Sequence, residues 1–405
     1  MLLLLLSCSK EPVPACKTPV DRVVLVIVDT LRADATAPEL EAFAAQSAVF
    51  TQAVAQSSWT RPTVTTLFTG LSPDQHRNGW FDSVLAPSAT TLAESYREAG
   101  WSAWGAFGNT IVREGSGLEQ GLDPWLDFAS KGNRGSRSPQ LVRRVLEELG
   151  EERELVVVHT IGPHEPYEPT AASAAATGAP TSGPLFERQL NHAALKRVDQ
   201  LGEGELEQLN ALYAAEVLDE AAALGPLLTD PRLQAALVVL TSDHGQANGD
   251  QGRLYHGIGP YSSQLHVPLM VRGPGVEPGE RSELVSHQDV HSTLLAALGE
   301  HEGRDLRCAL PAAEGVDLMD FERGKPPELA WTARIEGRLR GQWNEQRAFL
   351  FEDWQQDAPE QRLREDPRLD ELRARPRPAV EEGASSLVPR GKAQERELRA
   401  LGYIE

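Results

Sequence analysis

Short runs of consecutive apolar residues recur along this chain, and they limit the folds that it can adopt. The first run follows Arg22 and consists of six consecutive Val, Leu and Ile residues, most of them β-branched. An unbroken run of this kind is typical of a strand in a parallel sheet that is covered on both faces. Similar runs occupy residues 101–107, 155–159, 234–240 and 267–272. We therefore expect several buried strands in one sheet.

Helical segments are expected between these strands. The patterns predict helices over residues 37–46, 62–68, 90–99, 139–149 and 205–224, and Gly225-Pro226 should end or kink the last one. Pro62 suits the first turn of a helix, so Thr60 should lie at that helix's N-terminus. The alternation predicts an α/β fold with a mostly parallel sheet and helices on both faces. The stretch 171–184 is rich in Ala, Ser, Thr, Gly and Pro, which predicts an exposed loop.

The composition of the chain changes after Leu298-Gly299. Charged residues become frequent and apolar runs become short. We therefore expect a large domain over residues 21–300, followed over residues 301–405 by a small C-terminal α+β subdomain with a charged, partly disordered tail. A chain of 405 residues with 40% hydrophobic and 24% charged residues is long enough, and apolar enough, for this arrangement.

The net charge of the chain restricts its partners. It is −20 at pH 7, with an isoelectric point near 5.0, so the average surface repels nucleic acid and anionic membranes. A substrate that is itself an anion would need local attraction from a metal ion, from Arg and His side chains, or from helix N-termini.

The N-terminus begins with a short apolar stretch that ends at Cys8 and is too short to span a bilayer. Residues 5–8, Leu-Leu-Ser-Cys, resemble a bacterial lipobox, which implies that Cys8 carries a lipid. Residues 1–20 would then be a signal and tether, and Cys8 the only membrane anchor. The implied location is the periplasm or cell surface, and Ser9 suggests by resemblance the outer membrane of a Gram-negative cell. Cys16 and Cys308 could be free thiols or could form a disulfide with each other.

Acidic and imidazole side chains follow several of the predicted strands. Asp29, His159 and Asp243-His244 each stand at or just beyond the end of an apolar run. Because the carboxyl ends of parallel strands border one crevice, we expect these groups to meet there. We predict one divalent metal held by Asp29, Asp243 and His244, with Thr60 as the fourth group. The mixed oxygen and nitrogen set favours Zn or Mn over Ca or Mg. His159 is expected to be a hydrogen-bonded core histidine, although it could instead bind a second metal.

Residues 23–34, which contain Asp29, resemble the opening of sulfatase-like members of the alkaline phosphatase superfamily. Thr60-Arg61-Pro62, followed by Thr69-Gly70, is similar to the nucleophile helix of that family. Further landmarks occur in the family's order at residues 71–76, 117–123, 162–167, 213–219, 241–245, 267–275 and 398–403. The resemblance is continuous from residue 22 to about residue 300 and implies the α/β fold inferred above.

Departures from the family's pattern bear on the chemistry. Sulfatases carry Cys or Ser, converted to formylglycine, where this chain has Thr60, and an Arg four residues later, where it has Val64. They also tend to have two adjacent acids where this chain has Asp29-Thr30. A single acid, a Thr and then Asp243-His244 are similar to the single-metal phosphoethanolamine and phosphoglycerol transferases and the phosphodiesterases of the superfamily. This implies a hydrolase or transferase of phosphate diesters or monoesters, or of phosphonate esters.

The same resemblance implies roles for individual residues. Thr60 would be the nucleophile, activated by the metal. His164 and His256 would hold the anionic oxygens and protonate the leaving group. Arg61 and Asn109 would bind further oxygens of the substrate.

Two other functions are weighed against this one. A sulfuric-ester hydrolase would fit the fold, but Thr60 and Val64 argue against it. A non-catalytic cell-surface binding protein would have no need to keep Asp29, Asp243 and His244 together. Thr60 alone would also suit a helix N-cap. The substrate, and the choice between water and an alcohol as acceptor, depend on loops and stay open. Asp34, His76, His266, His287 and His291 are expected to be structural.

Overall fold

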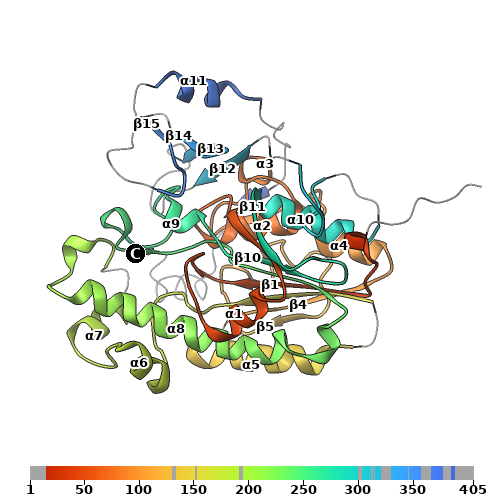
Figure 1. Ribbon diagram of the computed structural model, residues 1–405, viewed down its shortest axis with the longest axis horizontal. Helices are drawn as coiled ribbons and strands as arrows, with labels where there is room; N and C mark the ends of the chain where they lie inside the picture. Colours follow the sequence, from red (N-terminus) through yellow and green to blue (C-terminus); the bar gives the residue numbers. More distant parts are fainter. Residues whose placement is uncertain are drawn as a thin grey trace, which may run out of the picture.

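Figure 1 shows the fold, with a large twisted sheet between two helical layers and a small sheet beside them. The part of the chain that the computed structural model describes comprises residues 15–129, 134–150, 153–190, 195–299, 303–311, 313, 315–320, 330–344, 346–356, 366–376 and 385–387. Cys8, the closing motif at residues 398–403 and most of the charged tail lie outside these residues.

The large sheet has eight strands in the order β11-β2-β10-β7-β1-β6-β4-β5. Along the chain, the bounds are β1 (Arg22–Val28), β2 (Ala48–Val54), β4 (Ser102–Phe107), β5 (Trp125–Asp127), β6 (Glu154–Thr160), β7 (Leu237–Thr241), β10 (Leu269–Arg272) and β11 (Gly279–Ser286). β1 pairs in parallel with β6 on one side and with β7 on the other. Within this sheet β10 alone runs antiparallel to its neighbours. The predicted fold class, a mostly parallel α/β sheet, is confirmed.

Successive residues of β1 face opposite layers of the molecule. Val23, Leu25 and Ile27 pack with α2 (Thr60–Thr69), α4 (Leu92–Glu98) and α10 (His287–Ala296). The alternate residues of β1 pack with α1 (Pro38–Ala44), α5 (Arg134–Glu148) and α8 (Glu205–Leu228). Both faces of the strand are therefore buried, which is why its sequence is apolar throughout. Shorter helices are α3 (Pro73–His76), α7 (Pro184–Leu190) and α9 (Ser262–Leu265), and short strands are β3 (Ser83–Leu85), β8 (Ala247–Asn248) and β9 (Leu254–Tyr255).

The C-terminal part forms a small antiparallel sheet. Its strands are β12 (Val316–Asp320), β13 (Trp331–Glu336), β14 (Leu339–Trp343) and β15 (Ala348–Phe351), with α11 (Pro367–Ala374) beside them. This is the predicted small α+β part, and Figure 1 places it above the edge of the large sheet that carries β11. β16 (Ser385–Leu387) returns to pair with β3. The predicted division at residue 300 stays a prediction.

Cys16 and Cys308 form a disulfide with a Cα–Cα distance of 5.2 Å. The bond joins the segment before β1 to the segment before the small sheet, 292 residues later in the chain. The sequence left these cysteines free or paired, and the structure pairs them.

Three local predictions are wrong. Residues 171–184 are not one loop, because α6 (Ala171–Thr177) forms there. Its alanines favour a helix, Thr170 caps the N-terminus by accepting a hydrogen bond from Ser173 N, and Gly178 ends it in the left-handed conformation. α8 continues past Gly225-Pro226 to Leu228, because Leu227 and Leu228 pack in the core, so the end predicted at residue 224 is four residues early. The prediction also missed β2 and β11, because β11 lies at the sheet edge and its first half is polar and exposed.

Among the described residues, every helix is too short or too polar to cross a lipid bilayer.

Candidate active site

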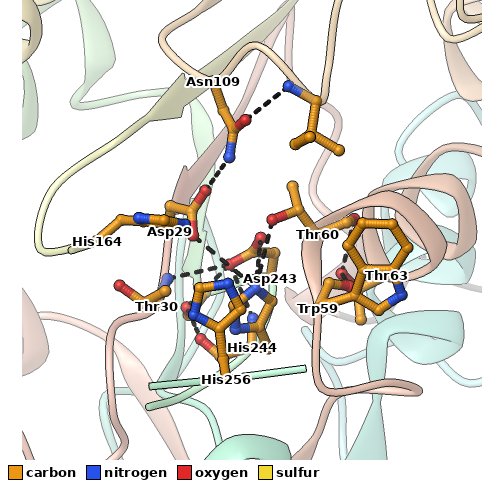
Figure 2. A network of polar contacts seen from close by, with 12 residues as sticks. Asp29, Thr30, Trp59, Thr60, Thr63, Asn109, His164, Asp243, His244 and His256 are labelled. Atoms are coloured by element: carbon orange, nitrogen blue, oxygen red, sulfur yellow. Dashed lines mark hydrogen bonds and ion pairs between the residues drawn. The ribbon is translucent and has the colours of Figure 1, made fainter. Parts of the chain in front are cut away.

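The predicted metal-binding residues meet at the carboxyl edge of the large sheet. Asp29 directly follows β1, Asp243 and His244 follow the neighbouring strand β7, and Thr60 opens α2. Figure 2 shows their side chains turned toward one another. All four residues are fully buried. This arrangement agrees with the expectation that these side chains meet at the carboxyl ends of the strands.

The two oxygens of Asp243 have different surroundings. Oδ1 accepts hydrogen bonds from the backbone N–H of Thr30 at 3.2 Å and of His244 at 2.8 Å. Oδ2 has no hydrogen-bond partner among the described residues and lies 3.4 Å from His244 Nε2. A buried carboxylate oxygen without a donor is costly unless a cation binds to it.

The ring of His244 is oriented by its own loop. Its Nδ1 lies 2.9 Å from the Gly245 carbonyl oxygen, which can only accept, so Nδ1 carries the proton. Nε2 is therefore the basic nitrogen, and it faces Thr60 Oγ1 at 3.3 Å and Asp29 Oδ1 at 3.9 Å. Burial lowers the pKa of His244 to about 4, against the opposing effect of the Asp243 carboxylate. The neutral ring is the form that binds a metal.

The sequence after His244 is explained by close packing. A Cβ added to Gly245 would lie 2.3 Å from the backbone oxygen of Ser263. Only glycine therefore fits at this position, directly after the two predicted ligands.

Thr60 is the first residue of α2 and does not act as its N-cap. The N-cap residue is Trp59, and the Thr60 hydroxyl points to His244. The backbone carbonyls of Trp59 and Thr60 both accept from Thr63 Oγ1 at 2.9 Å, which holds this first turn. A helix N-terminus at this point favours negative charge on the hydroxyl oxygen and on a bound anion. The interpretation of Thr60 as a simple N-cap is wrong.

These observations fit a divalent cation. Two carboxylates and one neutral imidazole converge, and Oδ2 of Asp243 lacks a hydrogen-bond donor among the described residues. Asp29, Asp243 and His159 also offer donor atoms that all lie within 4.8 Å of one another. The residues would therefore suit one metal with mixed oxygen and nitrogen ligands. Its identity stays a prediction.

His159 differs from its expected role. It lies in β6 and is fully buried, but neither ring nitrogen has a hydrogen-bond partner among the described residues. Nε2 lies 3.7 Å from Asp29 Oδ2, and burial lowers the pKa of the ring to about 4. The expectation of a hydrogen-bonded core histidine is wrong, because this ring borders the predicted metal site.

His164 and His256 are brought to the same site from different loops. Their ring centroids are 4.7 Å apart, and the His256 ring lies 4.5 Å from that of His244. His256 Nδ1 is 3.0 Å from Gln246 Oε1, and Gln246 Nε2 donates to Glu165 Oε2 at 2.8 Å. The proton of His256 is thus on Nδ1, while Nε2 has no partner among the described residues. That nitrogen is placed to exchange a proton with a ligand.

Asn109 and Arg61 are placed differently from each other. Asn109 Nδ2 donates to Asp29 Oδ2, while its Oδ1 accepts from Ile111 N at 2.7 Å (Figure 2). Asn109 therefore holds a predicted metal ligand.

Arg61 is fully buried, and its guanidinium donates to the carbonyls of Phe81 and Ser83 at 3.5 Å. Burial lowers its pKa to about 9. These contacts lie beside β3, and for both residues binding of substrate oxygens stays a prediction.

Sequence reasoning missed Glu165 and Gln246. Both are fully buried polar residues next to predicted site residues, Glu165 after His164 and Gln246 two positions after His244. The available signal in the sequence was that each of these polar residues stands inside a motif, but its burial could not be inferred.

The backbone next to the site is also strained, since Thr30 has φ 58° and Tyr255 has φ 69°, and each such conformation costs roughly 1–3 kcal/mol. These residues adjoin Asp29 and His256.

Comparisons with known proteins agree with this geometry. Residues 21–300 match the family model described as Sulfatase. The Low-salt glycan biosynthesis sulfotransferase Agl7 of Haloferax volcanii is 28% identical over 313 residues, which is 74% of this chain and 64% of that protein. Arylsulfatase K of Bos taurus is 32% identical over 102 residues, covering 24% of this chain and 19% of its own length. The chain thus spans less than two thirds of either curated relative.

A similar solved structure supports the fold. The phosphonate monoester hydrolase SpPMH from Silicibacter pomeroyi superposes with a TM-score of 0.68 at 17% identity, covering 87% of this chain and 93% of the other.

Proposed function

Because this chain belongs to the sulfatase family of ester hydrolases, we propose that it cleaves phosphate or phosphonate esters through Thr60. The observation that carries the proposal is the position of the Thr60 hydroxyl. It lies at a helix N-terminus, 3.3 Å from the basic nitrogen of His244 and beside the carboxylates of Asp29 and Asp243. A hydroxyl in such surroundings is suited to nucleophilic attack.

Asp29, Asp243 and His244 would hold the metal. A divalent cation bound there would lower the pKa of the Thr60 hydroxyl and neutralise oxygens of the anionic ester. Asn109 keeps the Asp29 carboxylate oriented, and the Gly245 carbonyl keeps His244 Nε2 directed to the site. The protein's own groups thus prepare the site before a substrate enters.

The proposed reaction has two steps. Thr60 Oγ1 gives its proton to bulk water and forms a bond to phosphorus, while the bond from phosphorus to the leaving oxygen breaks and that oxygen takes a proton from the imidazolium form of His256 or His164. Water or an acceptor alcohol then attacks phosphorus and gives its proton to the same imidazole, while the bond from phosphorus to Thr60 Oγ1 breaks and Oγ1 takes up a proton from water. His256 Nε2 suits the proton transfer, because Gln246 holds the other ring nitrogen.

Sulfate-ester cleavage is the second candidate function. The curated relatives named above are called a sulfotransferase and an arylsulfatase. Thr60 argues for phosphorus, because threonine cannot form the geminal diol from which formylglycine expels sulfate. Val64, where sulfatases have an arginine, is fully buried in the apolar core and supplies no cation.

A panel of chromogenic esters tests the proposal. We expect the purified protein with Zn or Mn to cleave at least one of a phosphate monoester, a phosphodiester and a phosphonate monoester faster than the matching sulfate ester. A sulfate ester cleaved much faster than every phosphorus ester would establish the second candidate instead. No cleavage, together with no stoichiometric metal, would support a binding protein without catalysis.

We also propose a location outside the cytoplasm, with Cys8 as lipid anchor. The Cys16–Cys308 disulfide supports this, because such bonds persist in oxidising compartments such as the periplasm. Expressed in a Gram-negative host with a complete signal, the protein should partition with membranes, and Cys8→Ser should release it or leave it unprocessed. The measurement is fractionation with detection of the lipidated N-terminal peptide. Equal solubility of both forms would contradict the anchor.

A further inference from the structure

The segment that leads into Thr60 is buried but has no regular structure. Residues 55–59 join the end of β2 to the start of α2, and all five are almost fully buried. Buried backbone groups outside a helix or sheet need other hydrogen-bond partners. We call residues 55–59 the nucleophile loop.

Asp320, the last residue of β12, supplies one backbone partner and two side-chain partners of this loop. Its Oδ1 accepts from Ser57 Oγ at 2.7 Å, and from both the N–H and the hydroxyl of Ser58 at 2.8 Å. Its Oδ2 also lies 2.8 Å from Ser58 Oγ. The carboxylate is fully buried. A buried carboxylate with several donors makes strong, charge-assisted hydrogen bonds.

The small sheet packs against the main body of the protein at the strand that carries Asp320. Val316 and Leu318 of β12 pack with Val54, Leu265 and Leu284 of the main body. The neighbouring Met319 N–H donates to the Gln56 carbonyl at 3.1 Å. Asp320 is therefore fixed both by its own strand and by the core between the two sheets.

The nucleophile loop also connects Thr60 to His256. The Ser58 carbonyl accepts from the N–H of Gly257 at 3.0 Å. Ser58 thus bonds to Asp320 through its N–H and hydroxyl and to the His256 loop through its carbonyl. Movement at Ser58 would shift Thr60, two residues later, and the residue after His256 together.

We propose that Asp320, which lies in the C-terminal sheet, is a positioning residue that fixes the position of the Thr60 hydroxyl. The inference rests on the proposed role of Thr60 as nucleophile. A misplacement of about 1 Å at a reacting group can reduce the rate about 100-fold, so an anchor two residues away affects kcat rather than substrate binding.

The test compares three variants by kinetics and by amide hydrogen exchange. Asp320→Ala removes every acceptor and should lower kcat by roughly 10- to 100-fold, with KM changed by less than about threefold. Asp320→Asn keeps one carbonyl oxygen for Ser58 N–H and should retain more activity than the alanine variant. Asp317→Asn is the matched control, because Asp317 lies on the same strand and pairs with Arg334 outside the loop. It should keep wild-type kcat.

Hydrogen exchange separates this inference from the proposed function. Exchange of the Ser58 and Trp59 amides should accelerate in Asp320→Ala and not in Asp317→Asn, whatever substrate the enzyme uses. Unchanged exchange at these amides would overturn the anchoring role, and faster exchange with wild-type kcat would overturn the link to Thr60. If the wild type cleaves no ester, the proposed function and this catalytic link both fail, while the exchange data still decide whether Asp320 anchors the loop.

Discussion

Replacing Thr60 by alanine is expected to lower kcat by several orders of magnitude while the protein stays folded. The hydroxyl is the only group at this position that could form the covalent intermediate, and it faces the basic nitrogen of His244. Losing it should cost about 1 kcal/mol of stability, as for the loss of one side-chain hydrogen bond. Steady-state kinetics and thermal unfolding measure the two effects.

Trapping provides the direct test of the Thr60 role. Rapid quenching with the best phosphorus ester should add a phosphoryl mass to the peptide that contains Thr60, and Thr60→Ala should lack it. Thr69→Ala is a suitable control, because Thr69 lies at the other end of α2, where its hydroxyl donates to the Thr65 carbonyl at 2.7 Å. Near wild-type turnover by Thr60→Ala would refute the nucleophile assignment.

Replacing Asp243 by alanine is expected to remove both the metal and the activity. Asp243 supplies a carboxylate oxygen that lacks a hydrogen-bond donor among the described residues and lies 3.4 Å from His244 Nε2. The wild type should be stabilised by added Zn or Mn, by about 2.7 kcal/mol at a free metal concentration of 100 Kd. The variant should show no such shift.

Metal content and thermal shift distinguish this effect from simple misfolding. Asp230→Asn is the control, since this carboxylate pairs with Arg232 beyond the end of α8, away from the site. It should bind metal and turn over substrate as the wild type does. An Asp243→Ala protein that still held stoichiometric metal would show that the ligand assignment is wrong.

The helices and strands around the site could be predicted because their signals are local. The apolar runs before Asp29 and Asp243 identify buried strands, and parallel strands bring their carboxyl ends to one edge. Weaker signals failed, as at the polar edge strand β11 and at α6, where alanine content outweighed a loop-like composition.

The roles of individual polar side chains could not be predicted in the same way. Asn109 contacts Asp29 across 80 residues of sequence, and Gln246 contacts Glu165 across 81. The local sequence does not indicate which buried polar groups will form hydrogen bonds with one another. His159 shows the same limit, since its position in a strand predicted burial but did not predict that its ring would lack a hydrogen-bond partner among the described residues.

The sequence by itself determined the α/β class and the gathering of Asp29, Asp243 and His244 at one edge, while the resemblance to the sulfatase-like family added Thr60 to this set. Hydrophobic periodicity and strand direction are enough for both, because they depend on neighbouring residues. Only the tertiary structure decided that Cys16 meets Cys308, that His244 presents Nε2, and that Asp320 holds the loop before Thr60 from 262 residues away. These contacts arise from the packing of distant segments, in which every buried donor and acceptor competes for a partner.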